Sequence, residues 1–530
     1  MGRWFTMSEE IALDGESLTP ADVEAVARQN AKVTIPEYVR EQVRDSRERI
    51  EDILETGEPV YGVNTGFGEL VQERIPNDKI ETIQQNLIRS HAAGAGEELP
   101  TAAVRAMLVT RLNALVKGFS GVRERIIDLL AGLLNKGVHP VVRSKGSLGA
   151  SGDLAPLAHM TLVLLGEGEA TIDGERLDGA TALERAGLTS VELHAKEGLA
   201  LINGTQLTVS LGALTVLDAE RAIRAADIAG AMTTEVTFST TASADSRIND
   251  VRPHRGHRES ADNIHAITID SEIIQSHRNC DRVQDAYSIR CLPQVHGAVR
   301  DAVRHLREAV TTELNSATDN PLVFDASGVD NRASGTDDAA VLSGGNFHGE
   351  PLALPLDYVT SALSELAAIS ERRLDRLLNP NVQEDHLPPF LAKDAGIQSG
   401  YMIAQYAAAD LVSTNQAEGK PSTTNIPVSG NQEDHVSMSA QSALRANSAV
   451  DRTLRVIASE LVCATEALEY VDSDLEPGSG TRAAQDCVRE RVPRLNGDRQ
   501  IYSDIDAVTE LIVSDTLDDR VERAIDGSLR

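Results

Sequence analysis

Apolar residues recur at spacings of three and four along most of the chain, the pattern of amphipathic helices. Residues 101–137 show it and end at a glycine, a common helix stop. Further long stretches cover 292–314, 355–378 and 435–471, the last about 55 Å long if it is one continuous helix. Helices of such length exceed those of ordinary globular domains and predict a long central bundle.

Strand signals are few and short. The stretches 170–177, around Asp173-Gly174, and 321–335 predict small peripheral hairpins. No alternation of strands and helices appears, which argues against a doubly wound nucleotide-binding fold. We therefore predict a mainly α fold with an N-terminal domain over 1–202 and a long-helix bundle domain over 203–530. Residues 1–7 are predicted to be an extension, with Met1 or Met7 as the start.

Composition narrows the classes of function. A net charge of −31 disfavours nucleic acid and anionic membranes as partners. No uninterrupted apolar run of about 18 residues and no signal peptide appear, so we expect a cytoplasmic chain that does not span a membrane. The four cysteines have neither metal-ligand nor redox spacing. Acid is spread along the chain and only eight of 50 basic residues are lysine, which predicts a surface adapted to high salt.

The stretch GSLGASGDLAPLAHM, residues 146–160, has three interpretations: a flexible loop before a helix, a phosphate cradle, or a reagent made from the backbone. In the third, the Gly152 amide nitrogen attacks the Ala150 carbonyl carbon and closes a five-membered ring. Glycine helps because it has no Cβ to block the approach. Loss of water from the ring and from Ser151 leaves a methylidene-imidazolone, an electrophile that ordinary side chains do not provide. The tripeptide alone occurs by chance in roughly one chain in five of this length.

The wider context is more specific, because 146–160 resembles the prosthetic-group loop of the aromatic amino acid ammonia-lyases and aminomutases. Further stretches match that family in order: YGVNTGFG (61–68), SHAAGAGE (90–97), EGLALINGTQ (197–206), QDAYSIRCLPQ (284–294), SGGNFHGEP (343–351) and NQEDHVSM (431–438). The resemblance implies the helical fumarase/aspartase-like fold and a homotetramer whose active sites are shared between chains. It also implies a cofactor made from Ala150, Ser151 and Gly152, the 4-methylidene-imidazole-5-one group (MIO), with no external cofactor.

Ammonia elimination needs an electrophile, a base for the β-hydrogen and an anchor for the substrate carboxylate. The resemblance makes Tyr61 the base, although a free phenol has a pKa near 10 that must be lowered. Arg290 matches the family's carboxylate anchor, and a guanidinium can grip a carboxylate with two parallel hydrogen bonds. The remaining matches surround the electrophile or help to form it: Tyr287, Asn203, Gln284 and Phe347, with Asp153 assisting cyclisation or acting as a helix N-cap.

Two positions point to the substrate. His91, after Ser90, and Glu433 match the positions found in histidine-specific members of the family. A histidine and a carboxylate can pair the donor and acceptor of an imidazole substrate, which a hydrocarbon slot would leave unpaired. The resemblance therefore predicts that L-histidine is converted to trans-urocanate and ammonia. Whether the amine or the imidazole adds to the electrophile stays open.

Several alternatives remain. The same fold could act on phenylalanine or tyrosine, or return ammonia to the β-carbon as an aminomutase. A non-catalytic helical scaffold or nucleotide-binding module would instead carry a chemically ordinary loop. The thirteen histidines are scattered and form no complete ligand set, so no metal is predicted. Residues 516–530 have no assigned role.

Overall fold

The computed structural model describes residues 10–57, 59–65, 76, 79–278, 282–327, 333–336 and 338–530. The chain forms two compact units, each assembled from separate segments. Unit 1 comprises Met1–Leu214, Leu306–Asp357 and Lys420–Leu444, and unit 2 comprises Thr215–His305, Tyr358–Gly419 and Arg445–Arg530. The sequence predicts a single boundary, after residue 202, whereas each compact unit takes three separate segments of the chain. The two-domain scheme stays a prediction.

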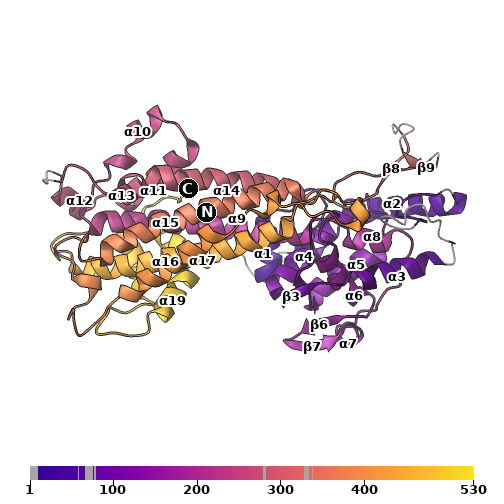
Figure 1. Cartoon of the computed structure of the whole chain (residues 1–530), viewed down its shortest axis with the longest axis horizontal. Helices are drawn as coiled ribbons and strands as arrows, with labels where there is room; N and C mark the ends of the chain where they lie inside the picture. Colours follow the sequence, from indigo (N-terminus) through magenta and orange to yellow (C-terminus); the bar gives the residue numbers. More distant parts are fainter. Residues whose placement is uncertain are drawn as a thin grey trace. The chain divides into compact units, whose positions relative to one another are not determined.

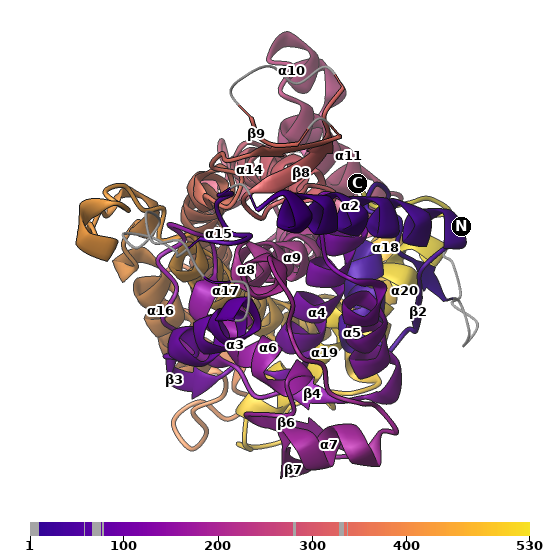
Figure 2. The ribbon, with the colours of Figure 1, turned by 90° about the vertical axis from the view of Figure 1, so that its right-hand side faces the viewer.

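Unit 1 holds the short helices that position the residues of interest, gathered around α4 (Figure 2). Every residue of α4 from Ala103 to Val116 is buried, so this helix lies in the core of the unit. The helices lying wholly in unit 1 are α1 (Pro20–Arg28), α2 (Glu37–Thr56), α3 (Ile80–His91), α4 (Thr101–Val116), α5 (Glu124–Lys136), α6 (Leu154–Leu164), α7 (Gly179–Arg185) and α8 (Glu197–Ile202).

The pattern over 101–137 forms two helices, α4 and α5, rather than one. Gly118 and Gly121 lie between them with φ values of +82° and +67°, backbone angles that end a helix and that glycine adopts at little cost. Helix α5 then ends at Gly137, which is left-handed as the predicted stop requires.

Unit 2 contains most of the length of the long helices. These helices are α9 (Gln206–Val236), α14 (Leu292–Leu314), α15 (Glu350–Leu378) and α17 (Ser439–Ala467), each beginning or ending in unit 1. The pattern over 435–471 thus gives a 29-residue helix, followed by the 3₁₀ turn Leu468–Tyr470. The prediction of a mainly α fold is confirmed.

Within unit 2 the long helices lie side by side (Figure 1) and share a buried polar network. Glu460 of α17 forms a two-pronged ion pair with Arg373 of α15 at 2.6 and 2.8 Å, both fully buried. Arg373 also contacts His296 of α14, and His296 contacts Asp227 of α9. Each buried charge therefore has a partner on another helix, which fixes the register of the four helices.

The other elements of unit 2 are short. The α-helices lying wholly in unit 2 are α10 (Ser246–Val251), α11 (Arg255–Ile267), α12 (Glu272–Ser276), α13 (Tyr287–Arg290), α16 (Met402–Ala417), α18 (Ser479–Arg489), α19 (Tyr502–Val513) and α20 (Thr516–Ala524). Short 3₁₀ turns lie at Ala242–Ala244 and Pro389–Leu391 in this unit, and at Pro421–Thr423 and Ser429–Asn431 in unit 1.

The strands are short and belong to unit 1. The predicted hairpin around Asp173-Gly174 is confirmed, since β6 (Glu169–Ile172) and β7 (Glu175–Asp178) pair across two residues with φ of +51° and +78°. The remaining strands are β1 (Ile11–Ala12), β2 (Val33–Thr34), β3 (Ala95–Glu98), β4 (His139–Pro140), β5 (Arg143–Lys145), β8 (Leu322–Asp325), β9 (Ser334–Gly335) and β10 (Ala339–Leu342).

The predicted hairpin over 321–335 is wrong in its pairing. Strands β8 and β9 do not pair with each other but flank β10, in the order β8-β10-β9. The sequence pattern missed β10 because its apolar run AAVL does not alternate with polar residues.

Helix α15 is the one helix in the described part of the chain whose length and hydropathy would suit a membrane span. In this fold 67% of its apolar window is buried within the protein, the pattern of a core helix.

Candidate active site

The loop 146–153 connects β5 to α6, and its backbone is pressed against a second turn at Gly204. Gly152 has a φ of +80°, and a Cβ built on it would lie 2.2 Å from the Gly204 carbonyl oxygen. The Asp153 amide donates a hydrogen bond of 2.6 Å to the same oxygen. Position 152 therefore requires glycine for two reasons: its backbone is left-handed, and there is no room for a Cβ.

Ser151 is held from two directions. Its carbonyl oxygen accepts a hydrogen bond of 2.7 Å from Nδ2 of Asn203, the residue that ends α8. Its hydroxyl donates to Oε1 of Glu433 at 3.0 Å. Ala150, just before it, is buried against Val436 and Met438. Predicted residues from three distant stretches thus meet at Ser151.

Asp153 is fully buried and forms the base of the loop. It occupies the N-cap position of α6, but its side chain makes no capping bond there. Its carboxyl group instead accepts from the Ser147 hydroxyl at 2.7 Å and from the Thr208 amide at 2.9 Å, in the first turn of α9. Asp153 is therefore the N-cap residue of α6 by position, but its side chain does not cap the helix. Burial raises the pKa of Asp153, and these hydrogen bonds partly oppose the rise.

The loop is also held by Ser437 and Met438, which the sequence analysis does not single out. The Ser437 hydroxyl donates to the Gly149 carbonyl at 3.1 Å, and the Met438 amide donates to the Leu148 carbonyl at 2.8 Å. A Cβ built on Gly149 would lie 2.1 Å from the Ser437 hydroxyl oxygen. Within the motif 431–438 the sequence points to Glu433 alone, because a carboxylate has an evident role in catalysis or binding and a serine in a loop does not.

His91, the last residue of α3, is half-buried. Its Nδ1 donates to the Leu87 carbonyl at 2.8 Å, so that in the neutral ring Nε2 carries the free lone pair. Burial lowers the pKa of His91, while the Leu87 carbonyl and the Glu433 charge partly oppose this. The predicted pair His91 and Glu433 is therefore close enough to interact electrostatically.

Two further predicted residues lie in unit 1, and their roles stay predictions. Tyr61 is half-buried in a turn, and the next residue packs closely against Leu199 of α8 and Pro321. The end of its motif, 66–68, lies outside the described residues. Phe347 is half-buried two residues before Gly349, whose amide donates to the Gly149 carbonyl at 3.3 Å.

The predicted residues Gln284, Tyr287 and Arg290 belong to unit 2. They line a cavity of about 1140 Å³, together with residues of the segment 238–248. Tyr287 is 74% exposed, and the Arg290 guanidinium carbon lies 5.8 Å from the centre of the Tyr287 ring. These side chains are thus accessible on the surface of unit 2 and available to another molecule.

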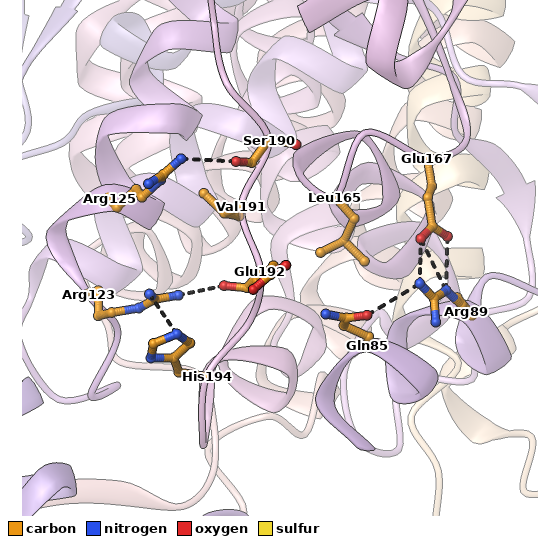
Figure 3. A pocket seen from close by; sticks show the side chains of 10 residues that line it. All are labelled: Gln85, Arg89, Arg123, Arg125, Leu165, Glu167, Ser190, Val191, Glu192 and His194. Carbon is orange, nitrogen blue, oxygen red and sulfur yellow. Dashed lines mark hydrogen bonds and ion pairs between the residues drawn. The ribbon is translucent and has the colours of Figure 1, made fainter. Parts of the chain in front are cut away.

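A second hollow of about 490 Å³ in unit 1 contains none of the predicted residues (Figure 3). Arg89 and Arg123 lie at its two sides, and Arg89 donates to both oxygens of Glu167. Arg123 bonds His194 and pairs with the buried Glu197. The two arginines of this hollow therefore already have hydrogen-bond and ion-pair partners within the chain. Across the described residues, no group of three His, Cys, Asp or Glu side chains could hold a metal ion.

Residues 18–490 match the family model of the aromatic amino acid lyases. The chain belongs to the aromatic amino acid lyase family. It is similar to the probable histidine ammonia-lyase of Halobacterium salinarum, with 61% identity over 98% of this chain and 99% of that one.

Solved structures agree with this family membership. The lyase is similar to the histidine ammonia-lyase of Trypanosoma cruzi, with 38% identity, a TM-score of 0.88 and coverage of 97% and 95% of the two chains. It is also similar to the tyrosine aminomutase of Streptomyces globisporus, with 36% identity, a TM-score of 0.90 and coverage of 98% and 100%. One fold therefore accommodates both reaction types.

The close approach at Gly152 of this lyase can be tested against Gly174, a glycine with nearly the same backbone. Gly174 has a φ of +78° but no atom within 4 Å of a built Cβ. We expect Gly174→Ala to lower the free energy of unfolding by about 1 kcal/mol, the cost of the backbone alone. Gly152→Ala should cost about 3 kcal/mol or more, because a methyl group would displace Gly204. Urea unfolding followed by circular dichroism measures both, and equal losses would show that the contact is unimportant.

Proposed function

We propose that the protein is a histidine ammonia-lyase, which converts L-histidine to trans-urocanate and ammonia. The observation that carries the proposal is the placement of Glu433. Its carboxylate lies 3.0 Å from the Ser151 hydroxyl, and its negative charge acts on the pKa of His91. A carboxylate thus lies at the residue expected to become the electrophile, within electrostatic range of the His91 imidazole. The similarity to two histidine ammonia-lyases supports the same substrate.

The loop fits the MIO group expected of the family. Gly152 has no Cβ and adopts a left-handed backbone conformation against Gly204, and Asn203 donates to the Ser151 carbonyl. The Ser151 hydroxyl, which must be lost, is in contact with Glu433. The group would be held by Ala150, Ser151 and Gly152 themselves. It would supply an electrophilic carbon that assists the departure of ammonia.

The specificity of the proposed reaction follows from the substrate's imidazole ring. One ring nitrogen of neutral histidine donates a hydrogen bond and the other accepts one. Nε2 of His91 can accept from the donor, and the Glu433 carboxylate stabilises the ring when it is protonated. A phenylalanine ring would leave both groups unpaired, which disfavours that substrate.

Arg290 and Tyr61 complete the proposed reaction. The Arg290 guanidinium would hold the substrate carboxylate with paired hydrogen bonds. Tyr61 would remove the β-proton in its phenolate form. We propose a homotetramer in which Arg290 and Tyr287 of one chain serve the Ser151 of another. The exposure of Tyr287 on the single chain supports such sharing.

The chemical proposal is tested by mass and by substrate. We expect the peptide 146–160 to weigh two waters less than its sequence, and histidine to be turned over much faster than phenylalanine or tyrosine. Ser151→Ala should lower kcat by on the order of a thousandfold or more, because no electrophile can form. A peptide of ordinary mass together with an active Ser151→Ala variant would disprove the mechanism. A β-amino acid product would instead identify an aminomutase.

The His91 interpretation predicts a difference in pH dependence. Because burial lowers the pKa of His91 below its ordinary 6.5, the ring stays neutral at pH 7 and gains a proton only in more acid solution. We expect KM for histidine to rise as pH falls through that lowered pKa, since Nε2 then no longer accepts. His91→Gln should have a higher KM at pH 7 but should lose this dependence. Titration of the substrate itself affects both proteins equally, so identical profiles would contradict the role.

Site sharing is tested by complementation. Ser151→Ala and Arg290→Met chains should each be inactive alone, since each lacks one part of every site. Co-expressed, they should recover a measurable fraction of wild-type activity in mixed oligomers, because some sites then contain both wild-type residues. Native mass spectrometry would establish the mixing. Mixed tetramers without activity would contradict the shared site.

A further inference from the structure

A cluster of buried charges lies directly behind the turn that supports Gly152. Arg111 of α4 and Lys196, just before α8, are fully buried, and Asp319 is nearly so. Nζ of Lys196 donates to Oδ2 of Asp319 at 2.8 Å, so these two form an ion pair. Arg111 makes no ion pair with any carboxylate in the described part of the chain. Burying a charged guanidinium without a carboxylate partner costs desolvation free energy, so its position calls for an explanation.

Arg111 contacts the turn 203–206 rather than a carboxylate. Its Nη1 donates to the Asn203 carbonyl at 3.0 Å and to Oε1 of Gln206 at 2.8 Å. A Cβ built on Gly204 would lie 2.7 Å from the same Nη1. The backbone of Gly204 therefore lies between the Arg111 guanidinium and Gly152. The turn carries both the Asn203 amide that bonds Ser151 and the Gly204 carbonyl that bonds Asp153.

The charges on the two sides of the turn differ in sign. Burial lowers the pKa of Arg111 to about 10, and Asp319 partly opposes this, so the guanidinium stays charged at neutral pH. With Lys196 and Asp319 paired, this side holds one net positive charge. On the other side, Thr205 donates to Glu313 at 2.5 Å, and burial raises the pKa of both Glu313 and Asp153. The turn is thus placed between a cationic and a weakly acidic cluster.

We propose that Arg111 is a positioning residue for formation of the prosthetic group from Ala150, Ser151 and Gly152. Its guanidinium fixes the turn against which Gly152 is bent, and its charge favours negative charge on the Ser151 carbonyl oxygen. This inference rests on the proposed function, because it concerns how the electrophile of that reaction is made.

The chemistry shows where the charge is needed. In ring closure the Gly152 nitrogen bonds to the Ala150 carbonyl carbon, and the Ala150 oxygen leaves as water with the amide hydrogens of Gly152 and Ser151. In dehydration the Ser151 Cα hydrogen leaves as a proton, and its electron pair forms the Cα–Cβ double bond. The hydroxyl departs with a proton as the second water. While the Cα–H bond breaks, negative charge gathers on the Ser151 carbonyl oxygen, which Asn203 contacts and the Arg111 charge stabilises.

The experiment measures formation of the group, not turnover. Full-length protein is sampled at fixed times after induction, and mass spectrometry gives the fraction of peptide 146–160 that has lost two waters. We expect Arg111→Met to slow this conversion by on the order of tenfold or more. Arg111→Lys, which keeps the charge but cannot reach both acceptors, should fall between Arg111→Met and the wild type.

Arg105 supplies the matched control. It lies on the same helix, is also buried, and donates to the Val26 and Leu134 carbonyls, away from the loop. Arg105→Met and Arg105→Lys should lose stability but convert at the wild-type rate. Circular dichroism and thermal melting establish that each variant is folded.

Each outcome decides the matter. Conversion of folded Arg111→Met at the rate of Arg105→Met would overturn the proposal. Equal slowing in Arg111→Met and Arg111→Lys would mean that packing, not charge, is responsible, and would overturn the electrostatic part. If Arg111→Met does not fold, Arg111→Lys decides against Arg105→Lys: slower conversion supports the proposal and equal conversion overturns it. If the wild-type peptide retains both waters, the proposed function itself fails, whatever the variants do.

Discussion

The contact between the backbones of Gly152 and Gly204 is the constraint on which the rest of the site depends. A Cβ on Gly152 would collide with the Gly204 backbone, and a Cβ on Gly204 would collide with Gln206 and Arg111, so both positions need glycine for the two loops to meet. The bond from the Asp153 amide to the Gly204 carbonyl fixes their alignment. This contact places the Asn203 amide on the Ser151 carbonyl. It also places the Asp153 carboxyl group where it accepts from Thr208 in the first turn of α9. The short helices of unit 1 hold these two loops together.

Burial of polar groups sets the chemistry of this region. Asp153 and Glu313 have raised pKa values on one side of the turn, whereas Arg111 is charged on the other. His91 has a lowered pKa and presents a lone pair, and Glu433 lies against the Ser151 hydroxyl. These groups are costly to bury, and hydrogen bonds within the fold offset much of that cost. Such an arrangement is typical of sites that must stabilise charge as it develops.

Much of the architecture could be predicted from the sequence, because long helices leave a strong periodic signal. The stretch 292–314 corresponds to α14 residue for residue. The break between α4 and α5 was missed, since an apolar pattern continues through Gly118 and Gly121 and only the backbone angles end the helix. Family motifs indicated His91, Asn203 and Glu433, and the structure brings the last two onto Ser151. Arg111 was missed because an arginine in an apolar helix has no partner visible in the sequence. Its partners are the Asn203 carbonyl and the Gln206 side chain, which the fold brings near.

The hydrogen bond from Ser151 to Glu433 joins residues 282 positions apart. During synthesis the ribosome needs on the order of tens of seconds to add that many residues. Throughout this interval the tripeptide already exists, but the carboxylate that contacts its hydroxyl does not. The contact that holds the Ser151 hydroxyl therefore forms only after residue 433 has been added, long after the tripeptide itself has been made.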